Sequence, residues 1–262
     1  SEMCIRDSFG IMTFEPVPVM FFNSKKKHHR INSLKQKKNQ LKQFKLDFLI
    51  IIKFNLQFSS LKAETFIKKI IYKKTNCQYL YVSKNFKFGF KRQGDIKILK
   101  KFEILYDFKT MITKPFKKNK ITISSTSIRK KISLGKIPEA NKLLNRKWTI
   151  NGKIIQGEKR GRKIGFPTCN IRLGEYVVPR LGVYSVKVKS LKFSKKGIAN
   201  VGYRPTFNGQ NLLLETNIFG INKNLYNKEI DIKFIKFIRP EKKFKNLEHL
   251  KKQIKIDIKK AK

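Results

Sequence analysis

Two spacings of apolar residues divide the chain into an N-terminal and a C-terminal half. In the first half, short apolar runs alternate with segments in which apolar side chains recur every three or four residues, as on one face of a helix. The runs at residues 9–14, 48–54 and 79–82 are predicted to be strands, and the segment 61–72 is predicted to be a helix. Strands that alternate with helices indicate a three-layer α/β unit with a parallel sheet.

Helix signals extend this pattern towards the middle of the chain. Asp95 is a suitable N-cap for a helix that carries apolar residues as far as Leu105. After the segment ISSTSIR a helix is predicted to run to Gly135, and IPEANKLL is predicted to form another.

From Trp148 onward apolar residues alternate with polar ones, which is typical of strands with one buried face. In VYSVKVK, for example, Tyr184, Val186 and Val188 share one face. Further elements are predicted at residues 198–201, 212–219 and 230–238 (strands) and 247–260 (a helix). Consecutive strands that are followed by one helix indicate a small closed antiparallel barrel.

The change of pattern predicts two domains, an α/β domain at residues 9–135 and a barrel domain at residues 136–262. Residues 1–8, SEMCIRDS, have no Met at their head and no pattern of their own, and a strand is predicted directly after them. We therefore expect residues 1–8 to be a non-native leader before a fragment whose true N-terminus is missing.

The charge of the chain is extreme. There are 62 Lys and Arg residues against 17 Asp and Glu residues, which gives a formal net charge of +45. Such a charge favours an anionic partner, for example nucleic acid, a membrane surface or a phosphorylated small molecule. The lysines are scattered through every segment, however, whereas a binding surface would be localised. We therefore attribute most of the charge to the codon usage of an AT-rich genome and expect no specific nucleic-acid partner.

Cys4, Cys77 and Cys169 are far apart and follow no metal-ligand spacing. They indicate a reducing compartment rather than a disulfide framework or a zinc site. No apolar run is long enough to cross a bilayer, and the N-terminus lacks the features of a signal peptide. We expect a cytoplasmic protein with no membrane partner, and the sequence leaves its oligomeric state open.

The segment 157–170, GEKRGRKIGFPTCN, combines glycines with cations and ends on small polar side chains. Glycines let backbone N–H groups approach a bound anion, and the neighbouring cations add positive charge. Pro167 fixes the backbone, so Thr168 and Asn170 emerge at a defined angle with oxygen atoms that suit Mg²⁺. The pattern alone is equally consistent with a hairpin loop that has ordinary turn glycines.

Glu215 lies inside an apolar strand, NLLLETNIF, where a buried carboxylate is costly unless it is paired or used in catalysis. Its functional interpretation is a general base for a hydroxyl nucleophile. Its structural interpretation is a salt bridge to one of the many lysines, and the residue taken alone favours that interpretation.

Several segments, in this order, closely resemble the riboflavin kinase domain of bacterial bifunctional riboflavin kinase/FAD synthetases. Within residues 141–262 they are GEKRGRKIGFPTCNI, LGVYSVKV, GIANVGYRPTFNG, LLLETNIFG, NLYNKEIDIKFIKFIRPEKKF and LEHLKKQIKIDIKKAK. The resemblance implies a six-stranded antiparallel barrel with a C-terminal helix. It also implies transfer of the γ-phosphate of ATP to the 5′-hydroxyl of riboflavin, which gives FMN.

The resemblance further implies roles for single residues. Glu215 matches the catalytic base, and Thr168 and Asn170 match the Mg²⁺–nucleotide positions of a Pro-Thr-Ala-Asn motif. Arg204 and Arg239 are the implied flavin-binding residues. The implied ATP-binding residues are Gly157, Gly161, Arg162, Lys163, Gly165, Pro167, Thr168 and Asn170.

Two positions of the kinase half depart from the family pattern. Cys169 stands in place of the Ala of the Pro-Thr-Ala-Asn motif, a small-for-small change that should do little harm. Asn217 stands where many relatives have His, and we expect no chemical role for it.

The N-terminal half resembles the FMN adenylyltransferase domain of the same enzymes, a nucleotidyltransferase with a Rossmann-like fold. The matching segments are TFEPVPVMFF, NFKFGFKRQGD and ISSTSIR. In the last segment the resemblance implies contacts to ATP phosphates from Ser124, Ser125, Thr126 and Arg129.

The N-terminal half also departs from the family pattern. The family's Gly-rich His-X-Gly-His motif, expected upstream of Phe9, is absent. Val17 stands where the family has His, and Asn85 where it has Asp. We therefore expect an incomplete, N-terminally truncated adenylyltransferase domain without efficient activity.

Two other functions stay open at this point. A nucleic-acid-binding module with an OB-like barrel would need aromatic residues on an exposed strand face, whereas Tyr184, Phe219 and Phe234 fall in the apolar alternation. A non-catalytic flavin-binding protein would have degraded kinase motifs, and these are largely intact.

Overall fold

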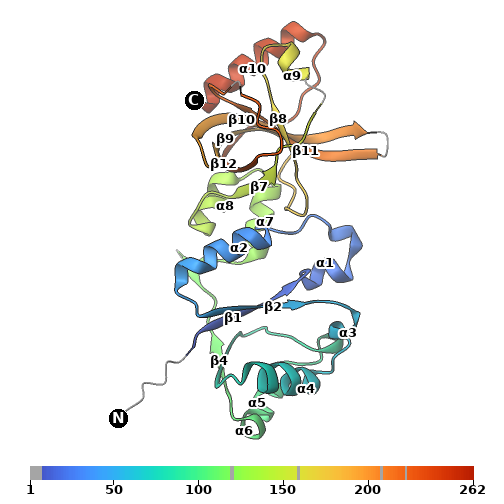
Figure 1. The fold of residues 1–262 in the computed structure, drawn as a ribbon, viewed down its shortest axis with the longest axis vertical. Helices are drawn as coiled ribbons and strands as arrows, with labels where there is room; N and C mark the ends of the chain where they lie inside the picture. Colours follow the sequence, from blue (N-terminus) through green and yellow to red (C-terminus); the bar gives the residue numbers. More distant parts are fainter. Residues whose placement is uncertain (1–7, 119–120, 158–159, 207–208, 222) are drawn as a thin grey trace. The chain divides into compact units, whose positions relative to one another are not determined.

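The computed structural model describes residues 8–118, 121–157, 160–206, 209–221 and 223–262 (Figure 1). Residues 1–7, most of the predicted leader, lie outside the described residues. Contacts divide the chain into two compact units, and each unit is discontinuous in sequence. The N-terminal unit comprises Ser1–Lys25 and Leu46–Ile123, and the C-terminal unit comprises Lys26–Lys45 and Ser124–Lys262.

The N-terminal unit contains two pairs of parallel strands. β1 (Gly10–Glu15) pairs with β2 (Phe48–Lys53), and β3 (Tyr79–Ser83) pairs with β4 (Lys109–Thr113). The three predicted strands are confirmed to within one residue at each end, and so is their parallel sense. Among the described residues no ladder of hydrogen bonds joins the two pairs, so the predicted sheet is present as two separate halves.

Short helices and one small hairpin complete this unit. They are α1 (Pro18–Phe22), η1 (Ser24–Lys26, at the junction with the other unit), α3 (Leu56–Ser59), α4 (Ala63–Phe66), the π-helix η3 (Ile67–Thr75), η4 (Phe90–Arg92), α5 (Ile96–Lys101), α6 (Glu103–Tyr106), β5 (Lys117–Lys118) and β6 (Ile121–Thr122). The predicted cap is confirmed, because Asp95 Oδ1 accepts a hydrogen bond from Ile98 N at 3.2 Å at the start of α5.

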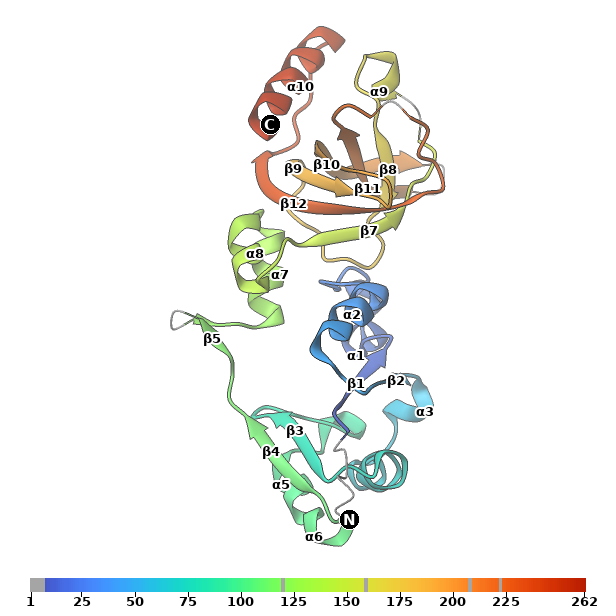
Figure 2. The ribbon, with the colours of Figure 1, turned by 60° about the vertical axis from the view of Figure 1, so that its left-hand side comes forward.

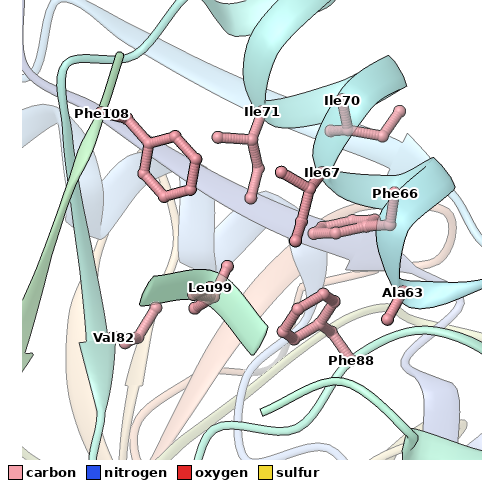
Figure 3. Close-up of a cluster of buried hydrophobic side chains, with 9 residues drawn as sticks. All are labelled: Ala63, Phe66, Ile67, Ile70, Ile71, Val82, Phe88, Leu99 and Phe108. Carbon is pink, nitrogen blue, oxygen red and sulfur yellow. The ribbon is translucent and has the colours of Figure 1, made fainter. Parts of the chain in front are cut away.

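One continuous helical face builds the core of the N-terminal unit (Figure 3). Along α4 and η3 the buried residues recur with helical spacing, and they are Ala63, Phe66, Ile67, Ile70 and Ile71. They pack against residues from the neighbouring strands, loops and α5, namely Val82, Phe88, Leu99 and Phe108. The helix predicted at 61–72 is therefore present, and it continues as a π-helix to Thr75.

Six antiparallel strands form the barrel of the C-terminal unit, in the order β7-β12-β9-β10-β11-β8. The strands are β7 (Thr149–Lys153), β8 (Cys169–Arg172), β9 (Gly182–Lys189), β10 (Ser194–Thr206), β11 (Gly209–Ile218) and β12 (Glu229–Arg239). A bridge between the ends of the sheet, in which Ile155 N donates to Asn170 O at 2.9 Å, nearly closes the barrel. The predicted antiparallel barrel is confirmed.

The interior of the barrel follows the predicted alternation. Tyr184, Val186 and Val188 are buried, and the ring of Phe234 lies 5.0 Å from that of Tyr184 and 4.7 Å from that of Trp148, measured between centroids. Large interlocked aromatic rings contribute much of the apolar surface that such a small barrel buries.

The last helix, α10 (Leu247–Ala261), covers part of the outer face of the barrel (Figure 2). Ile254 and Ile258 of α10 pack against Val183 and Ile198. For this reason Ser185, on the predicted polar face, is buried as well, and its hydroxyl donates to Ala261 O at 3.2 Å.

The C-terminal unit begins earlier than the predicted limit at residue 136. Helices α7 (Ser125–Ser133) and α8 (Ile137–Leu144) both belong to it, as Figures 1 and 2 show. Arg180 N donates to Ile132 O of α7 at 3.4 Å. In α8, the Asn141 amide donates to Phe234 O at 3.0 Å and its Oδ1 accepts from Trp148 N at 2.6 Å. Buried hydrogen bonds of this kind tie the helical pair to the barrel.

Residues 26–45 also belong to the C-terminal unit, although the sequence places them inside the predicted α/β domain. They contain α2 (Leu34–Leu41) and η2 (Lys42–Phe44). Trp148 Nε1 donates to Ile31 O at 3.0 Å, and the Tyr176 hydroxyl donates to Gln36 Oε1 at 2.9 Å. These contacts are made by backbone carbonyls and amide side chains, which leave no apolar pattern in the sequence.

The core of the N-terminal unit makes a stability prediction. Ile67→Ala is expected to lower the free energy of unfolding by about 2–5 kcal/mol, since Ile67 is completely buried and its truncation leaves a cavity. Urea unfolding followed by circular dichroism measures the difference. Ile104→Ala is the matched control, because the Ile104 side chain is 96% exposed and the change should stay within about 0.5 kcal/mol. Equal losses in the two variants would contradict this core.

Candidate functional site

The segment 157–170 approaches the barrel through one short turn of helix, α9 (Arg160–Lys163), before it enters β8. Glu158 and Lys159 lie outside the described residues, and so does the side chain of Lys163, one of the predicted ATP-binding residues.

The three glycines of the segment have different structural roles. Gly165 has a φ of +87° and open space around it, so it serves the turn after α9. A Cβ at Gly161 would lie 2.4 Å from Phe166 O and 3.2 Å from Thr168 Oγ1. A Cβ at Gly157 would lie 1.7 Å from Asn170 Nδ2. Gly161 and Gly157 thus allow the loop to pack closely against Pro167–Asn170, which we call the polar tetrapeptide.

Asn170 and Glu215 lie opposite each other on neighbouring strands. They are partners in the β8–β11 ladder, so their side chains are on the same face of the sheet. Asn170 is only 7% exposed, and its Oδ1 has no hydrogen-bond partner. A buried acceptor without a partner is rare and points to a group that the structure does not contain.

Glu215 forms a salt bridge, but its partner is an arginine and not one of the lysines. Arg204 Nη2 donates to Glu215 Oε2 at 2.7 Å, and both side chains are about one-third exposed (33% and 29%). The hydrogen bond to Glu215 raises the pKa of Arg204 further above its usual range. The predicted base and one predicted flavin-binding residue are therefore in direct contact.

Arg204 also contacts a residue that sequence reasoning missed. Glu241 Oε1 lies 3.4 Å from Arg204 Nη1 and accepts a hydrogen bond from Asn200 Nδ2 at 3.1 Å. Asn200 is the partner of Glu215 in the β10–β11 ladder, and its Oδ1 is a second buried acceptor without a partner. Asn200 lies in the segment GIANVGYRPTFNG, and Glu241 lies in the segment FIRPEKKF. The resemblance of these segments to the family is the only feature of the sequence that could have indicated the two residues.

A cavity of about 420 Å³ lies next to the segment 162–169, and neither Asn170 nor Glu215 lines it. Four of the predicted ATP-binding residues line it, namely Arg162, Gly165, Pro167 and Thr168. An apolar wall is contributed by Ile154, Ile218, Ile221, Leu225 and Tyr226. Thr216 also lines the cavity, and its buried hydroxyl has no hydrogen-bond partner. A cavity with apolar walls and a few polar groups is typical of small-molecule sites.

The oxygen atoms of this region fit a hard divalent cation. Asn170 Oδ1 is an unpartnered acceptor, and the hydroxyl of Thr168 lies two residues before it in an exposed position. Mg²⁺ prefers such oxygen ligands and usually completes its shell with water and phosphate. Within the described part of the chain, no three His, Cys, Asp or Glu side chains gather where they could hold a metal.

Two further predicted residues are used in packing. Asn217 Nδ2 donates to Pro167 O at 2.7 Å, which fixes the tetrapeptide to β11. Arg239 Nε lies 3.0 and 2.9 Å from the two carboxylate oxygens of Asp257, a buried residue of α10. The flavin-binding role of Arg239 stays a prediction, and in this structure its guanidinium anchors the C-terminal helix.

The ISSTSIR segment forms the start of α7. Ser124 is the N-cap, since its hydroxyl accepts from Ser127 N at 3.1 Å, and Ser125 and Thr126 follow in exposed positions in the first turn. Arg129 Nε donates to His29 O at 2.7 Å. Burial lowers the pKa of Arg129, and burial together with the neighbouring cations lowers the pKa of His29. Contacts to ATP phosphates stay a prediction for these residues.

Comparison with known proteins assigns both halves. The riboflavin kinase family matches residues 144–262, and the FAD synthetase family matches residues 6–127. A bifunctional riboflavin kinase/FMN adenylyltransferase from Buchnera aphidicola subsp. Schizaphis graminum is 42% identical over 253 residues, which are 95% of this chain and 81% of the relative. The chain belongs to the bifunctional riboflavin kinase/FMN adenylyltransferase family. Its barrel is accordingly a riboflavin kinase domain, which phosphorylates riboflavin to FMN.

Other relatives agree with this assignment. The bifunctional riboflavin kinase/FMN adenylyltransferase of Escherichia coli K12 is 34% identical over 93% of this chain and 78% of the relative. Among solved structures, a protein from Streptococcus pneumoniae described as a macrolide-efflux protein is similar over 97% of this chain and 83% of that chain, with a TM-score of 0.82 and 30% identity. None of the described helices of this chain is both long and apolar enough to span a membrane.

The family match corrects one expectation. Because the FAD synthetase family matches residues 6–127, the adenylyltransferase domain is present, and its predicted truncation is not supported. The family pattern therefore extends over residues 6–127 although the His-X-Gly-His motif is absent.

The three aromatic residues named for the nucleic-acid alternative pack in apolar clusters. Tyr184 and Phe234 are completely buried in the barrel, and Phe219 packs against the cluster under α10. These rings are therefore not available as stacking platforms for bases.

The thiol of Cys169 gives a prediction for this site. Burial raises its pKa to about 12, so at pH 8 its thiolate fraction is roughly a thousandfold below that of a thiol with a pKa of 9. Alkylation of Cys169 by iodoacetamide, followed by peptide mass spectrometry, is expected to be slow in the folded protein and to accelerate as the pH rises. The same thiol in urea is the control. Equal rates in the folded and unfolded states would contradict its burial.

Proposed function

We propose that the face shared by Asn170 and Glu215 carries out the phosphoryl transfer of the riboflavin kinase unit. The observation that supports this most directly is the pairing of a half-buried carboxylate with a buried, unpartnered amide oxygen on adjacent strands. Phosphoryl transfer needs positioning, neutralisation of phosphate charge and a base near the attacking hydroxyl. The face offers a group for each of these tasks.

In this proposal the nucleotide occupies the 420 Å³ cavity. The apolar wall suits the faces of a nucleobase, and the side lined by Arg162 and Thr168 suits phosphates. Close packing of Gly157 and Gly161 against Asn170 and Thr168 leaves no side chain between the loop and those polar atoms. The phosphates would then lie on the side of the cavity that Thr168 lines.

Thr168 and Asn170 would hold Mg²⁺ through their side-chain oxygens. When bound, the cation neutralises phosphate charge and orients the transferred group. Gly157 supports this role, because any side chain there would displace the amide of Asn170.

Glu215 would act as the general base. The 5′-hydroxyl oxygen of riboflavin forms a bond to the γ-phosphorus, the bond from that phosphorus to the β–γ bridging oxygen breaks, and the hydroxyl proton passes to the Glu215 carboxylate. ADP is the leaving group. Arg204 donates a hydrogen bond to the carboxylate and holds it in one orientation.

The flavin would lie over Arg204 and the segment that begins at Arg239. Arg204 borders the base directly, and the unpartnered Oδ1 of Asn200 is a ready acceptor for a ribityl hydroxyl. The ion pair between Arg239 and Asp257 would hold the start of this segment in place, so that the segment can contact the flavin.

The FAD synthetase domain, matched at residues 6–127, would adenylylate the FMN that the kinase makes. Ser124, Ser125 and Thr126 stand at the N-terminus of α7, where free N–H groups favour phosphate. Both reactions consume ATP, and we place them in the cytoplasm.

Glu215→Gln tests the base. The amide cannot accept the proton, so kcat for FMN formation is expected to fall by about 10²–10⁴-fold, while riboflavin binding changes little. Chromatography of FMN measures turnover, and quenching of flavin fluorescence measures binding. Glu229→Gln makes the same change in a surface ion pair with Lys35 and should leave both quantities unchanged. Full activity of Glu215→Gln would remove Glu215 from the role of base.

Asn170→Ala tests the cation site. Loss of the amide oxygen is expected to raise the Mg²⁺ concentration needed for half-maximal activity by about tenfold, in line with the effect of losing one ligand interaction. A Mg²⁺ titration of the kinase rate at saturating ATP measures this concentration. Asn39→Ala, at an exposed position of α2, is the control. An unchanged Mg²⁺ dependence in Asn170→Ala would contradict the assignment.

A further inference from the structure

A second cavity of the C-terminal unit has a volume of about 1350 Å³, and neither Asn170 nor Glu215 lines it. Its lining residues lie in the ranges 35–43, 146–151, 189–193 and 221–233, and we call it the basic cleft. α2 contributes one part of its wall, and β7, β12 and the turn between β9 and β10 contribute others. Segments that are far apart in the sequence thus enclose one concave surface.

Cations outnumber carboxylates in the basic cleft. Eight of its 22 lining residues are Lys or Arg, and two are acidic. Both acids are already engaged, because Glu229 pairs with Lys35 and Asp231 accepts a hydrogen bond from Asn151 Nδ2 at 2.8 Å. Among the residues that the structure describes, no carboxylate pairs with six of the lining lysines, which are Lys147, Lys189, Lys192, Lys223, Lys228 and Lys233. The cleft therefore presents uncompensated positive charge, and a concave surface of one sign of charge concentrates anions.

The gathering of these cations is a property of the fold and not of the sequence. Along the chain the lysines are scattered, and a scattered charge gives no reason to expect a binding surface. In the folded C-terminal unit, lysines from α2, from β9, from the loop before β12 and from β12 itself line the same cleft. Codon usage accounts for the number of lysines in the chain, but it does not select a concave surface for them.

The uncharged residues of the cleft indicate the class of anion. Asn39 and Gln43 line it in exposed positions, and Leu191 and Phe193 add an apolar surface at the turn between β9 and β10. Amide side chains both donate and accept hydrogen bonds, which matches nucleobases and ribose, whereas a phosphate only accepts them. An aromatic side chain beside a basic groove is suited to stacking with bases. These groups favour a nucleic-acid strand over an inorganic polyphosphate.

We propose that the basic cleft binds single-stranded nucleic acid, mainly through its phosphates and with little dependence on base sequence. The lysines neutralise the backbone, while Phe193 and the amides contact bases. Ile221, Lys223 and Leu225 line this cleft and the 420 Å³ cavity, so a bound strand lies next to the proposed nucleotide site without filling it. The interaction is additional to riboflavin phosphorylation and does not depend on which residues catalyse that reaction.

The test removes three charges at exposed positions of the cleft in one variant that combines Lys189→Gln, Lys192→Gln and Lys228→Gln. Fluorescence anisotropy measures the binding of a labelled single-stranded RNA of about 12 nucleotides, a length within the site sizes of small barrels. The affinity at about 100 mM salt is expected to fall about tenfold or more. The slope of log affinity against log salt should flatten by about 2, because each phosphate contact contributes about 0.7. The rate of FMN formation should stay unchanged.

The matched control combines Lys252→Gln, Lys255→Gln and Lys259→Gln, which remove the same charge from exposed positions of α10, and it should bind RNA as the unmodified chain does. Equal losses in the two variants would overturn the proposal, because net charge alone would then explain the attraction. Displacement of the RNA by saturating ATP at matched ionic strength would also overturn it, since the RNA would then occupy the nucleotide cavity. So would equal affinity for an inorganic polyphosphate with the same number of phosphates, because no base would then be contacted.

Discussion

The antiparallel pairing of β8 with β11 is the constraint on which the kinase site depends. Ile171 and Leu214 are partners in this ladder and both are buried in the barrel. Their burial fixes the register, because a slip by one residue would turn them out of the core. The next pair along the ladder, Asn170 and Glu215, must then face the other way. The apolar core of the barrel thus orients two polar side chains that contribute nothing to it.

Carboxylates are scarce in this chain, and their placement is therefore informative. With 17 Asp and Glu residues against 62 Lys and Arg residues, most cations have no carboxylate available to them. Even so, Arg204 is bound by Glu215 and Glu241, and Arg239 is bound by Asp257. Exposed lysine pairs contribute little to stability. The half-buried arginine pairs near the barrel end are the ones that shape the site.

Apolar spacing predicted much of the fold. The strands of the N-terminal unit, the helical face from Ala63 to Ile71 and the barrel alternation all bury large side chains, which leave a periodic trace in the sequence. The placement of residues 26–45 left no such apolar trace, because its contacts to the rest of the unit include polar ones made by Ile31 O, His29 O, the amide of Gln36 and the Lys35–Glu229 ion pair. Any residue has a backbone carbonyl, so the sequence carries no signal for that contact.

Only those residues of the candidate site that lie in family motifs could be predicted from the sequence. The polar tetrapeptide and Glu215 were identified by resemblance to a family, whereas the partner of Glu215 was expected to be a lysine. Arg204 lies 11 residues before Glu215 in a hairpin, and Glu241 lies 37 residues after Arg204, so their meeting depends on strand register and on the path of the chain after β12. Spacing along the sequence does not report such long-range geometry.

The discontinuity of the C-terminal unit has a consequence for how the polypeptide matures. Lys35 forms an ion pair with Glu229, 194 residues further along the chain. During synthesis residues 26–45 leave the ribosome early. The barrel residues that they contact are synthesised much later, so these contacts cannot form until most of the chain has been made. The N-terminal unit, whose second part ends at Ile123, can complete its contacts sooner. Contacts between distant parts of a chain form slowly, so the kinase unit is expected to mature last, and a cut at residue 124 would leave it without one of its own parts.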